Sequence, residues 1–264
     1  DTMGYNSYLA VGTGLEKRMN TKLWPNSDYE MIDVTTDDYI NNDKFLAYYM
    51  TVSGHLNYTK TGNCMVSRNL DEVKELPYSE KAKNYLAANI ELDKAVGELI
   101  NNLEEAGKLE DTVIVISGDH YPYGLTTKQI NEVSTFNRDD KFELYHTSLI
   151  IYNPSIERTE INDTISGIDI LPTLYNLYGI EYDSRLYMGR DIFSEQEHVV
   201  ILSDRSWITS KGKYNSVNGK FIKTTEEELN EEEYINKINK IANERFTISS
   251  SILDSDYYSK LVIE

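Results

Sequence analysis

The chain has 264 residues, with 26 basic against 44 acidic side chains and a formal net charge of -18 at pH 7. This balance argues against nucleic acid as a partner, because phosphate backbones attract basic surfaces. Cys64 is the only cysteine, so no disulfide can form within the chain. No stretch approaches the roughly 18 apolar residues that a membrane-spanning helix needs.

The composition of the first 55 residues predicts loops followed by one strand. Residues 1–44 are polar and rich in turn residues, which favours loops with short elements. Residues 45–52 (FLAYYMTV) are continuously apolar and aromatic, which predicts a strand buried on both faces. This strand ends at Ser53-Gly54-His55, and residues 56–78 then form a long polar connection.

A helix and a second buried strand follow. Ser79 is expected to cap a helix whose apolar side chains recur at helical spacing as far as Leu103, and Gly107 ends it. The β-branched residues 113–116 predict a strand of a parallel sheet. Strand, helix and strand in this order form a βαβ unit, which requires parallel pairing and a right-handed crossover.

Both predicted strands end on a histidine, at His55 and at His120. The carboxyl ends of parallel strands share one edge of a sheet, where open α/β sheets place their ligand sites. Asp119 precedes His120, and a carboxylate beside an imidazole suits Mn²⁺ or Zn²⁺. The alternative is a turn with a hydrogen-bonded aspartate and a solvated histidine. His55 is a candidate substrate ligand or general acid, or else a turn residue that caps its strand.

Three other polar residues are assigned structural roles. His146 and His198 each lie at the beginning of a predicted strand, away from the proposed edge. Asp169 opens a predicted helix over 165–179, where its carboxylate is expected to cap backbone N–H groups.

The rest of the chain predicts a loop, two strands, a hairpin and a final helix. The loop over 121–140 has a length typical of functional loops. The other elements are strands at 149–152 and 198–202, a hairpin over 207–224 and a helix after the acidic run 226–233.

The combined pattern predicts an α/β fold: a mostly parallel sheet flanked by helices, with a C-terminal antiparallel hairpin and helix. Two parts are expected, a main domain over 1–205 and a hairpin-helix subdomain over 206–264. No phosphate-binding loop, nucleophile elbow or Ser-His-Asp order is present. Two metal ligands without a nucleophile do not make a complete catalyst.

Several of these motifs resemble a known family. Residues 118–121 (GDHY), the helix end at 103–112 (LEEAGKLEDT) and the stretch 166–180 (SGIDILPTLYNLYGI) resemble the sulfatase branch of the alkaline phosphatase superfamily. Residues 51–55 (TVSGH) and the tail from 207 to 220 are similar, more narrowly, to the lipoteichoic acid synthase group. The resemblance covers nearly the whole chain and identifies the main domain over 1–205 as part of a sulfatase-like catalytic domain.

The resemblance implies roles for three residues. Asp119 and His120 would be metal ligands, with Mn²⁺ as the metal and Mg²⁺ or Zn²⁺ as alternatives, and His55 would contact the phosphate of the substrate. A glutamate ligand and a threonine nucleophile would precede residue 1, so this chain holds no catalytic nucleophile. We therefore expect the chain alone to be inactive or nearly so, and to self-associate through exposed sheet edge and apolar surface.

By the same resemblance, the parent protein would be a phosphoglycerol transferase of cell-envelope polymer synthesis with a phospholipid substrate. It would be tethered upstream to the extracellular face of the cytoplasmic membrane, whereas the present chain is expected to be soluble. Two alternatives stay open: a sulfatase or phosphodiesterase that hydrolyses a soluble phosphate or sulfate ester, and a non-catalytic binding module. Asp119-His120 favours the transferase, because true sulfatases usually carry an Asp-Asn pair there.

Overall fold

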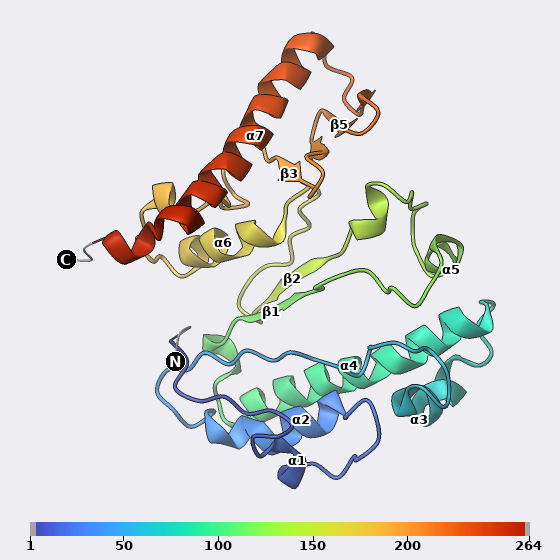
Figure 1. Ribbon diagram of the computed structural model, residues 1–264. Coiled ribbons are helices and arrows are strands. Elements are labelled where there is room, and N and C mark those ends of the chain that lie inside the picture. Colours follow the sequence, from blue (N-terminus) through green and yellow to red (C-terminus); the bar gives the residue numbers. More distant parts are fainter. Residues whose placement is uncertain (1–3, 262–264) are drawn as a thin grey trace. The chain divides into compact units, whose positions relative to one another are not determined.

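The computed structural model describes residues 4–261, which divide into two compact units, 1–158 and 159–264 (Figure 1). The boundary expected after residue 205 falls inside the second unit and stays a prediction. Among the described residues, no helix is both long and apolar enough to cross a bilayer.

The first unit is a group of helices beside a short two-stranded sheet. Its helices are α1 (Leu15–Arg18), α2 (Asp28–Thr35), α3 (Cys64–Val73), α4 (Glu80–Glu105) and α5 (Thr127–Glu132). Its strands are β1 (Ile114–Ser117) and β2 (Leu149–Tyr152), and single 3₁₀ turns span Thr36–Asp38, Leu109–Asp111 and Glu143–Tyr145.

The long helix α4 confirms the helix predicted from apolar spacing. It packs against α2 and α3 through alanines that let the helix backbones approach closely: Ala82, Ala87, Ala88 and Ala95 are buried. Gly107 follows its end with φ +65°, a conformation that favours glycine. Ser79 occupies the predicted N-cap position, but its side chain accepts no capping bond and its own N–H donates to Glu132 Oε2 at 2.6 Å.

Two helices lie in segments that were predicted as loops. The connection over 56–78 contains α3, which begins at the buried N-cap Asn63 and buries Met65 and Val66. The loop over 121–140 contains α5, whose first turn is closed by a capping box of Thr126 and Gln129. In both cases the cap residue was the available signal, since polar composition alone favours a loop.

Residues 45–52 do not form the predicted strand, and Figure 1 shows them as an extended coil. Most side chains of this run face solvent, including three in succession at 46–48, while Tyr49 hydrogen-bonds to the hydroxyl of Tyr39 at 3.0 Å. The large exposed side chains are Leu46 (79%), Tyr48 (71%) and Met50 (76%). These exposed side chains exclude a strand buried on both faces, and the prediction had assumed such a strand.

The predicted parallel pairing is also wrong for the described chain. β1 and β2 pair antiparallel, with Ile114 opposite Tyr152 and Ser117 opposite Leu149, and both sheets within residues 4–261 contain antiparallel pairs only. The reason is that α4 follows an extended coil, so there is no first strand for a parallel crossover. The α/β class and the C-terminal hairpin with its helix are confirmed.

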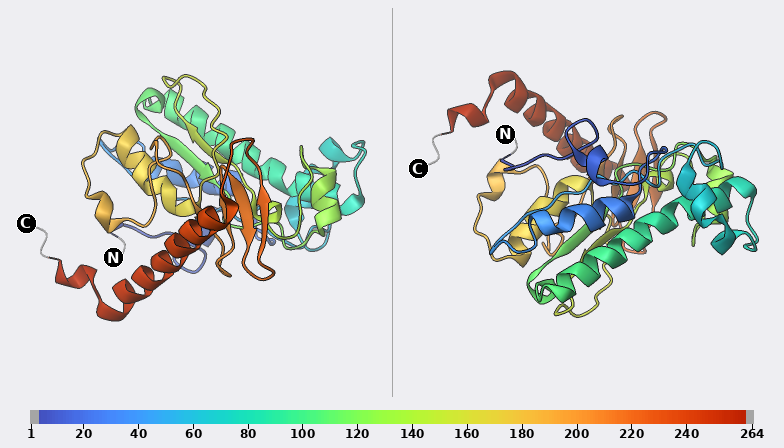
Figure 2. Two further views of the ribbon diagram at one scale, coloured as in Figure 1. Left: turned by 90° about the horizontal axis from the view of Figure 1, so that it is seen from above. Right: turned by 90° about the horizontal axis from the view of Figure 1, so that it is seen from below.

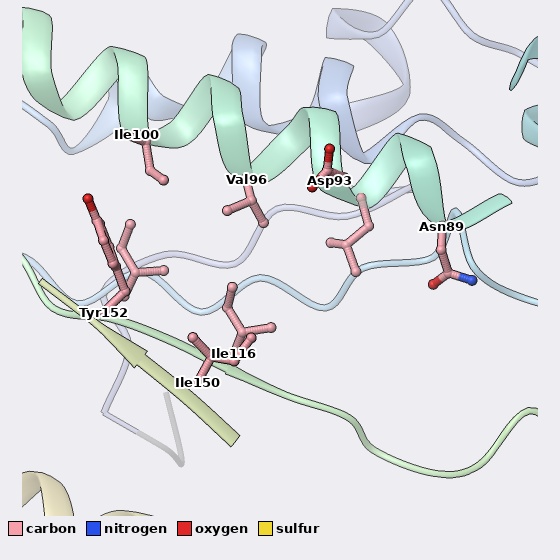
Figure 3. Close-up of a pocket in the computed structure, with 9 residues that line it drawn as sticks. Asn89, Asp93, Val96, Ile100, Ile116, Ile150 and Tyr152 are labelled. Atoms are coloured by element: carbon pink, nitrogen blue, oxygen red, sulfur yellow. The ribbon is translucent and has the colours of Figure 1, made fainter. Parts of the chain in front are cut away.

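An open apolar groove separates α4 from the β1–β2 sheet. Ile116, Ile150 and Tyr152 lie on one face of the sheet and point toward Val96 and Ile100 of α4 across about 380 Å³ (Figure 3). Ile150 remains 51% exposed. The sheet face is therefore only partly covered, and the self-association expected of the chain stays a prediction.

The second unit contains the four-stranded sheet β3-β4-β5-β6 and the long helix α7. Its elements are α6 (Ile170–Leu177), β3 (Val200–Ile201), β4 (Trp207–Thr209), β5 (Gly212–Asn215), β6 (Lys220–Lys223) and α7 (Glu231–Ser255), with 3₁₀ turns at Gly167–Asp169, Ser184–Leu186 and Tyr258–Lys260. The views in Figure 2 show α7 alongside this sheet. Trp207, Tyr234 and Ile238 form the centre of the core between them.

Candidate functional site

His55 and His120 share one local arrangement. Nδ1 of His55 lies 2.7 Å from the carbonyl oxygen of Leu56, and Nδ1 of His120 lies 2.8 Å from the carbonyl oxygen of Tyr121. A carbonyl oxygen only accepts, so Nδ1 carries the proton in both rings. Each imidazole, when neutral, therefore presents Nε2 with a free lone pair, which is the form that binds a metal.

Asp119 and His120 place a carboxylate oxygen and an imidazole nitrogen side by side. Oδ2 of Asp119 lies 3.5 Å from Nε2 of His120, with the side chains 85% and 39% exposed. Two ligand atoms at about 2.1 Å from a tetrahedral ion lie about 3.4 Å apart, so this spacing suits a shared cation. Within residues 4–261, no group of three or more histidine, cysteine, aspartate or glutamate side chains forms a metal site.

The loops that follow the two histidines pack on one hydrophobic cluster. Leu56 and Tyr121, the residues directly after His55 and His120, both contact the buried cluster of Tyr58, Leu125 and Ile130. Gly124 approaches Tyr58 so closely that an added Cβ would lie 2.8 Å from the ring. The structure thus brings the residues that follow both histidines to the same cluster, whereas the parallel sheet edge that was predicted to hold the histidines is absent from the described residues. The binding roles of His55, Asp119 and His120 stay predictions.

An aromatic ring contacts each histidine, and sequence reasoning missed both rings. Trp24 packs edge-on against His55 with ring centroids 5.4 Å apart, and it is 54% exposed. Tyr123 stacks on His120 at 4.2 Å with an interplanar angle of 10°. These rings limit the orientations that the imidazoles can adopt and add apolar surface beside them.

A buried carboxylate holds the segment that leads to His55. Oδ1 and Oδ2 of Asp28 accept hydrogen bonds from the N–H groups of Val52 and Ser53 at 2.8 and 2.9 Å. The hydroxyl of Ser53 in turn accepts from the N–H of Asp28 at 3.0 Å. Burial raises the pKa of the Asp28 carboxyl above its ordinary 3.8, the nearby charge of Glu91 raises it further, and the two N–H bonds oppose the rise.

This raised pKa predicts a pH dependence of stability. A carboxyl group whose pKa is higher in the folded state stabilises the fold at low pH, and that contribution is lost as pH rises from 3.8 through the folded-state pKa. We therefore expect the free energy of unfolding of the wild type, relative to Asp28→Asn, to fall across that window. Urea unfolding of both proteins from about pH 4 to about pH 7 measures the difference. Parallel curves would show that Asp28 ionises as it does in the unfolded chain.

The residues assigned structural roles have packed or capping surroundings. Nδ1 of His146 lies 3.0 Å from Glu143 Oε2, and its ring packs on Phe136. Nε2 of His198 is buried without a hydrogen-bond partner among the described residues. The cap predicted for Asp169 is confirmed, because its carboxylate accepts from the N–H groups of Ser166 and Arg190 at 2.8 and 2.7 Å.

Comparison with known proteins gives consistent matches. The family model described as Sulfatase matches residues 2–180. Lipoteichoic acid synthase 2 of Bacillus subtilis (strain 168) is 25% identical over 180 residues, which are 66% of this chain and 27% of the relative. Lipoteichoic acid synthase of Staphylococcus aureus (strain USA300) is 25% identical over 233 residues, 82% of this chain and 35% of the relative. The chain thus spans about a third of these curated relatives.

A solved structure is similar in fold. The crystal structure of the lipoteichoic acid synthase LtaP from Listeria monocytogenes superposes with a TM-score of 0.67 and 22% sequence identity. The match covers 90% of this chain and 62% of that protein. The likeness therefore extends over both units described above.

Proposed function

The chain belongs to the sulfatase family of enzymes, and from this membership we propose that it is part of a metal-dependent phosphoglycerol transferase of cell-envelope polymer synthesis. Support for the narrower assignment comes from the similarity to lipoteichoic acid synthases in sequence and in fold. The proposal concerns a longer parent protein, at the extracellular face of the cytoplasmic membrane, with a phospholipid as donor. On its own the present chain is proposed to be inactive or nearly so.

One observation carries the metal part of this proposal. With Nδ1 of His120 bonded to a carbonyl, the Nε2 lone pair and a carboxylate oxygen of Asp119 face each other at 3.5 Å. Two electron-rich atoms at this distance repel unless a proton or a metal ion lies between them, and the donor set of one nitrogen and one oxygen suits Mn²⁺, with Mg²⁺ or Zn²⁺ as alternatives. A bound ion would polarise a phosphoryl oxygen of the substrate. The remaining ligands and the nucleophile are proposed to come from the parent protein.

His55 is proposed to bind the phosphate group of the substrate. Its Nδ1–H is held by the carbonyl of Leu56, so protonation of the ring adds a second N–H at Nε2, directed away from the main chain. A charge-assisted hydrogen bond from that N–H suits a phosphate oxygen. Trp24 shields one side of the ring from water and keeps its orientation.

The parent protein provides the test, with Mn²⁺ and a fluorescent phosphatidylglycerol as donor. We expect release of diacylglycerol that requires Mn²⁺ and that falls about a hundredfold in His55→Ala, the usual scale of a positioned proton donor. His146→Ala is the matched control, since His146 is also exposed but is paired with Glu143 and packs on Phe136, and it has no proposed role at the substrate. Its activity should equal that of the wild type.

The other outcomes separate the alternatives. Cleavage of a soluble phosphate or sulfate ester without release of diacylglycerol would make the parent a hydrolase. Binding of substrate without any turnover would favour a non-catalytic module. Equal activity of His55→Ala and the wild type would remove His55 from the site.

A further inference from the structure

The first residues of α3 connect the two segments that carry the Trp24–His55 pair. Nδ2 of Asn63 donates to the carbonyl oxygens of Ser53 and His55, both at 2.8 Å. The N–H of Cys64 donates to the carbonyl oxygen of Trp24 at 3.0 Å. Two loops that lie about 30 residues apart in sequence are thus bound to one helix terminus.

We propose that Asn63 is a positioning residue that fixes the direction in which the His55 imidazole and the Trp24 ring face a ligand. Its relevance to the reaction rests on the proposed function of His55 as a phosphate contact. The positioning itself depends only on the contacts of Asn63.

The side chain of Asn63 uses its full hydrogen-bonding capacity. Besides the two donated bonds, Oδ1 accepts from the N–H groups of Met65 at 2.9 Å and Val66 at 3.4 Å, which makes Asn63 the N-cap of α3. Asn63 is completely buried. A serine or aspartate could still cap the helix, but neither supplies two N–H donors for the carbonyl groups of the other loop.

Asp28 and Asn63 together hold the main chain around His55 from two sides. Asp28 binds the N–H groups of Val52 and Ser53, and Asn63 binds the carbonyl oxygens of Ser53 and His55. The N–H of His55 donates to Val52 O at 3.0 Å and closes the turn. With the main chain held in this way, the ring has little freedom beyond its own side-chain torsions.

Asn63→Ser separates positioning from folding, because serine keeps the cap of α3 and removes both Nδ2 donors. The matched control is Asn69→Ser, which removes a buried amide from the same helix, one that donates to Ala87 O and not to the His55 loop. Three readouts are compared. They are amide hydrogen exchange at His55, acrylamide quenching of tryptophan emission, and the affinity for inorganic phosphate, measured by the change in tryptophan emission on titration. Emission accessible to acrylamide comes mainly from Trp24, since Trp207 is fully buried.

We expect Asn63→Ser to retain its helix content while exchange at His55 becomes about tenfold faster or more, because two hydrogen bonds no longer oppose local opening. Trp24 should become more accessible to acrylamide, and phosphate should bind about tenfold more weakly. Asn69→Ser should match the wild type in all three readouts even where its overall stability falls.

Equal exchange and quenching in Asn63→Ser and the wild type would overturn the proposal. Equal changes in both variants would also overturn it, because they would reflect general loss of stability. If phosphate does not bind the wild type, the role of His55 fails, while exchange and acrylamide quenching still decide whether Asn63 positions the loop.

Discussion

Replacing Asp119 or His120 by alanine is expected to abolish measurable Mn²⁺ binding by this chain. The two ligand atoms lie 3.5 Å apart, and within residues 4–261 they are not part of a larger cluster of ligand side chains, so each supplies half of the proposed protein coordination. Loss of an outer-shell partner alone weakens metal sites about ten- to a hundredfold, so loss of one of two ligands should cost at least a hundredfold. Titration calorimetry and the electron paramagnetic resonance signal of free Mn²⁺ both measure this.

The Glu143–His146 pair is the matched control for the metal experiment. It also joins a carboxylate to an imidazole, at 3.0 Å, but the carboxylate approaches Nδ1 and not a freely presented Nε2. The double variant Glu143→Ala/His146→Ala should bind Mn²⁺ like the wild type. If this variant and Asp119→Ala/His120→Ala bind alike, the acidic surface as a whole attracts the ion and the proposed half-site is wrong.

Trp207→Ala is expected to cause the largest loss of stability among the substitutions considered. Trp207 is fully buried between the sheet and α7, stacks on Tyr214 at 5.4 Å and meets Tyr234 edge-on at 5.9 Å. Its Nε1–H donates to Asn239 Oδ1 at 2.9 Å. Truncating a buried tryptophan costs about 3–5 kcal/mol, and the amide of Asn239 would lose its partner as well.

Urea unfolding followed by far-ultraviolet circular dichroism and by exchange of α7 amides measures this loss. The control is Trp24→Ala, since Trp24 is 54% exposed and lies in the other unit. We expect Trp24→Ala to leave exchange in α7 unchanged. A loss below about 1 kcal/mol in Trp207→Ala would mean that the core of the second unit repacks around the cavity.

The sequence correctly predicted the elements that depend on local periodicity. It did not predict whether a segment forms a strand when that depends on contacts with residues distant in the chain. The helix α4 and the three antiparallel strands β4, β5 and β6 have strong periodic patterns, and all are present. Residues 45–52 are as apolar as a buried strand, but a strand also needs hydrogen-bonded neighbours, and periodicity does not reveal whether those exist. The helix α3 was missed because its polar composition favours a loop, although Asn63 was an available cap signal.

The residues of the candidate site also differ in whether the sequence alone could predict their proximity. Asp119 and His120 are neighbours in sequence, so their proximity could be predicted without a fold. Asn63 and Trp24 reach His55 through folding, and a single sequence carries no sign of those contacts. Asparagine is common in loops and caps, so nothing in the sequence separates Asn63 from an ordinary turn residue.

The acceptors that fix the two proposed functional imidazoles are main-chain atoms, the carbonyl oxygens of residues 56 and 121. Every amino acid has a carbonyl group, so no side-chain replacement at either position removes the acceptor. Leu56 and Tyr121 can therefore diverge among descendants of this protein without changing which ring nitrogen carries the proton. Selection on those two positions then acts on side-chain packing, against the cluster of Tyr58, Leu125 and Ile130 and, for residue 121, also against the ring of Tyr123.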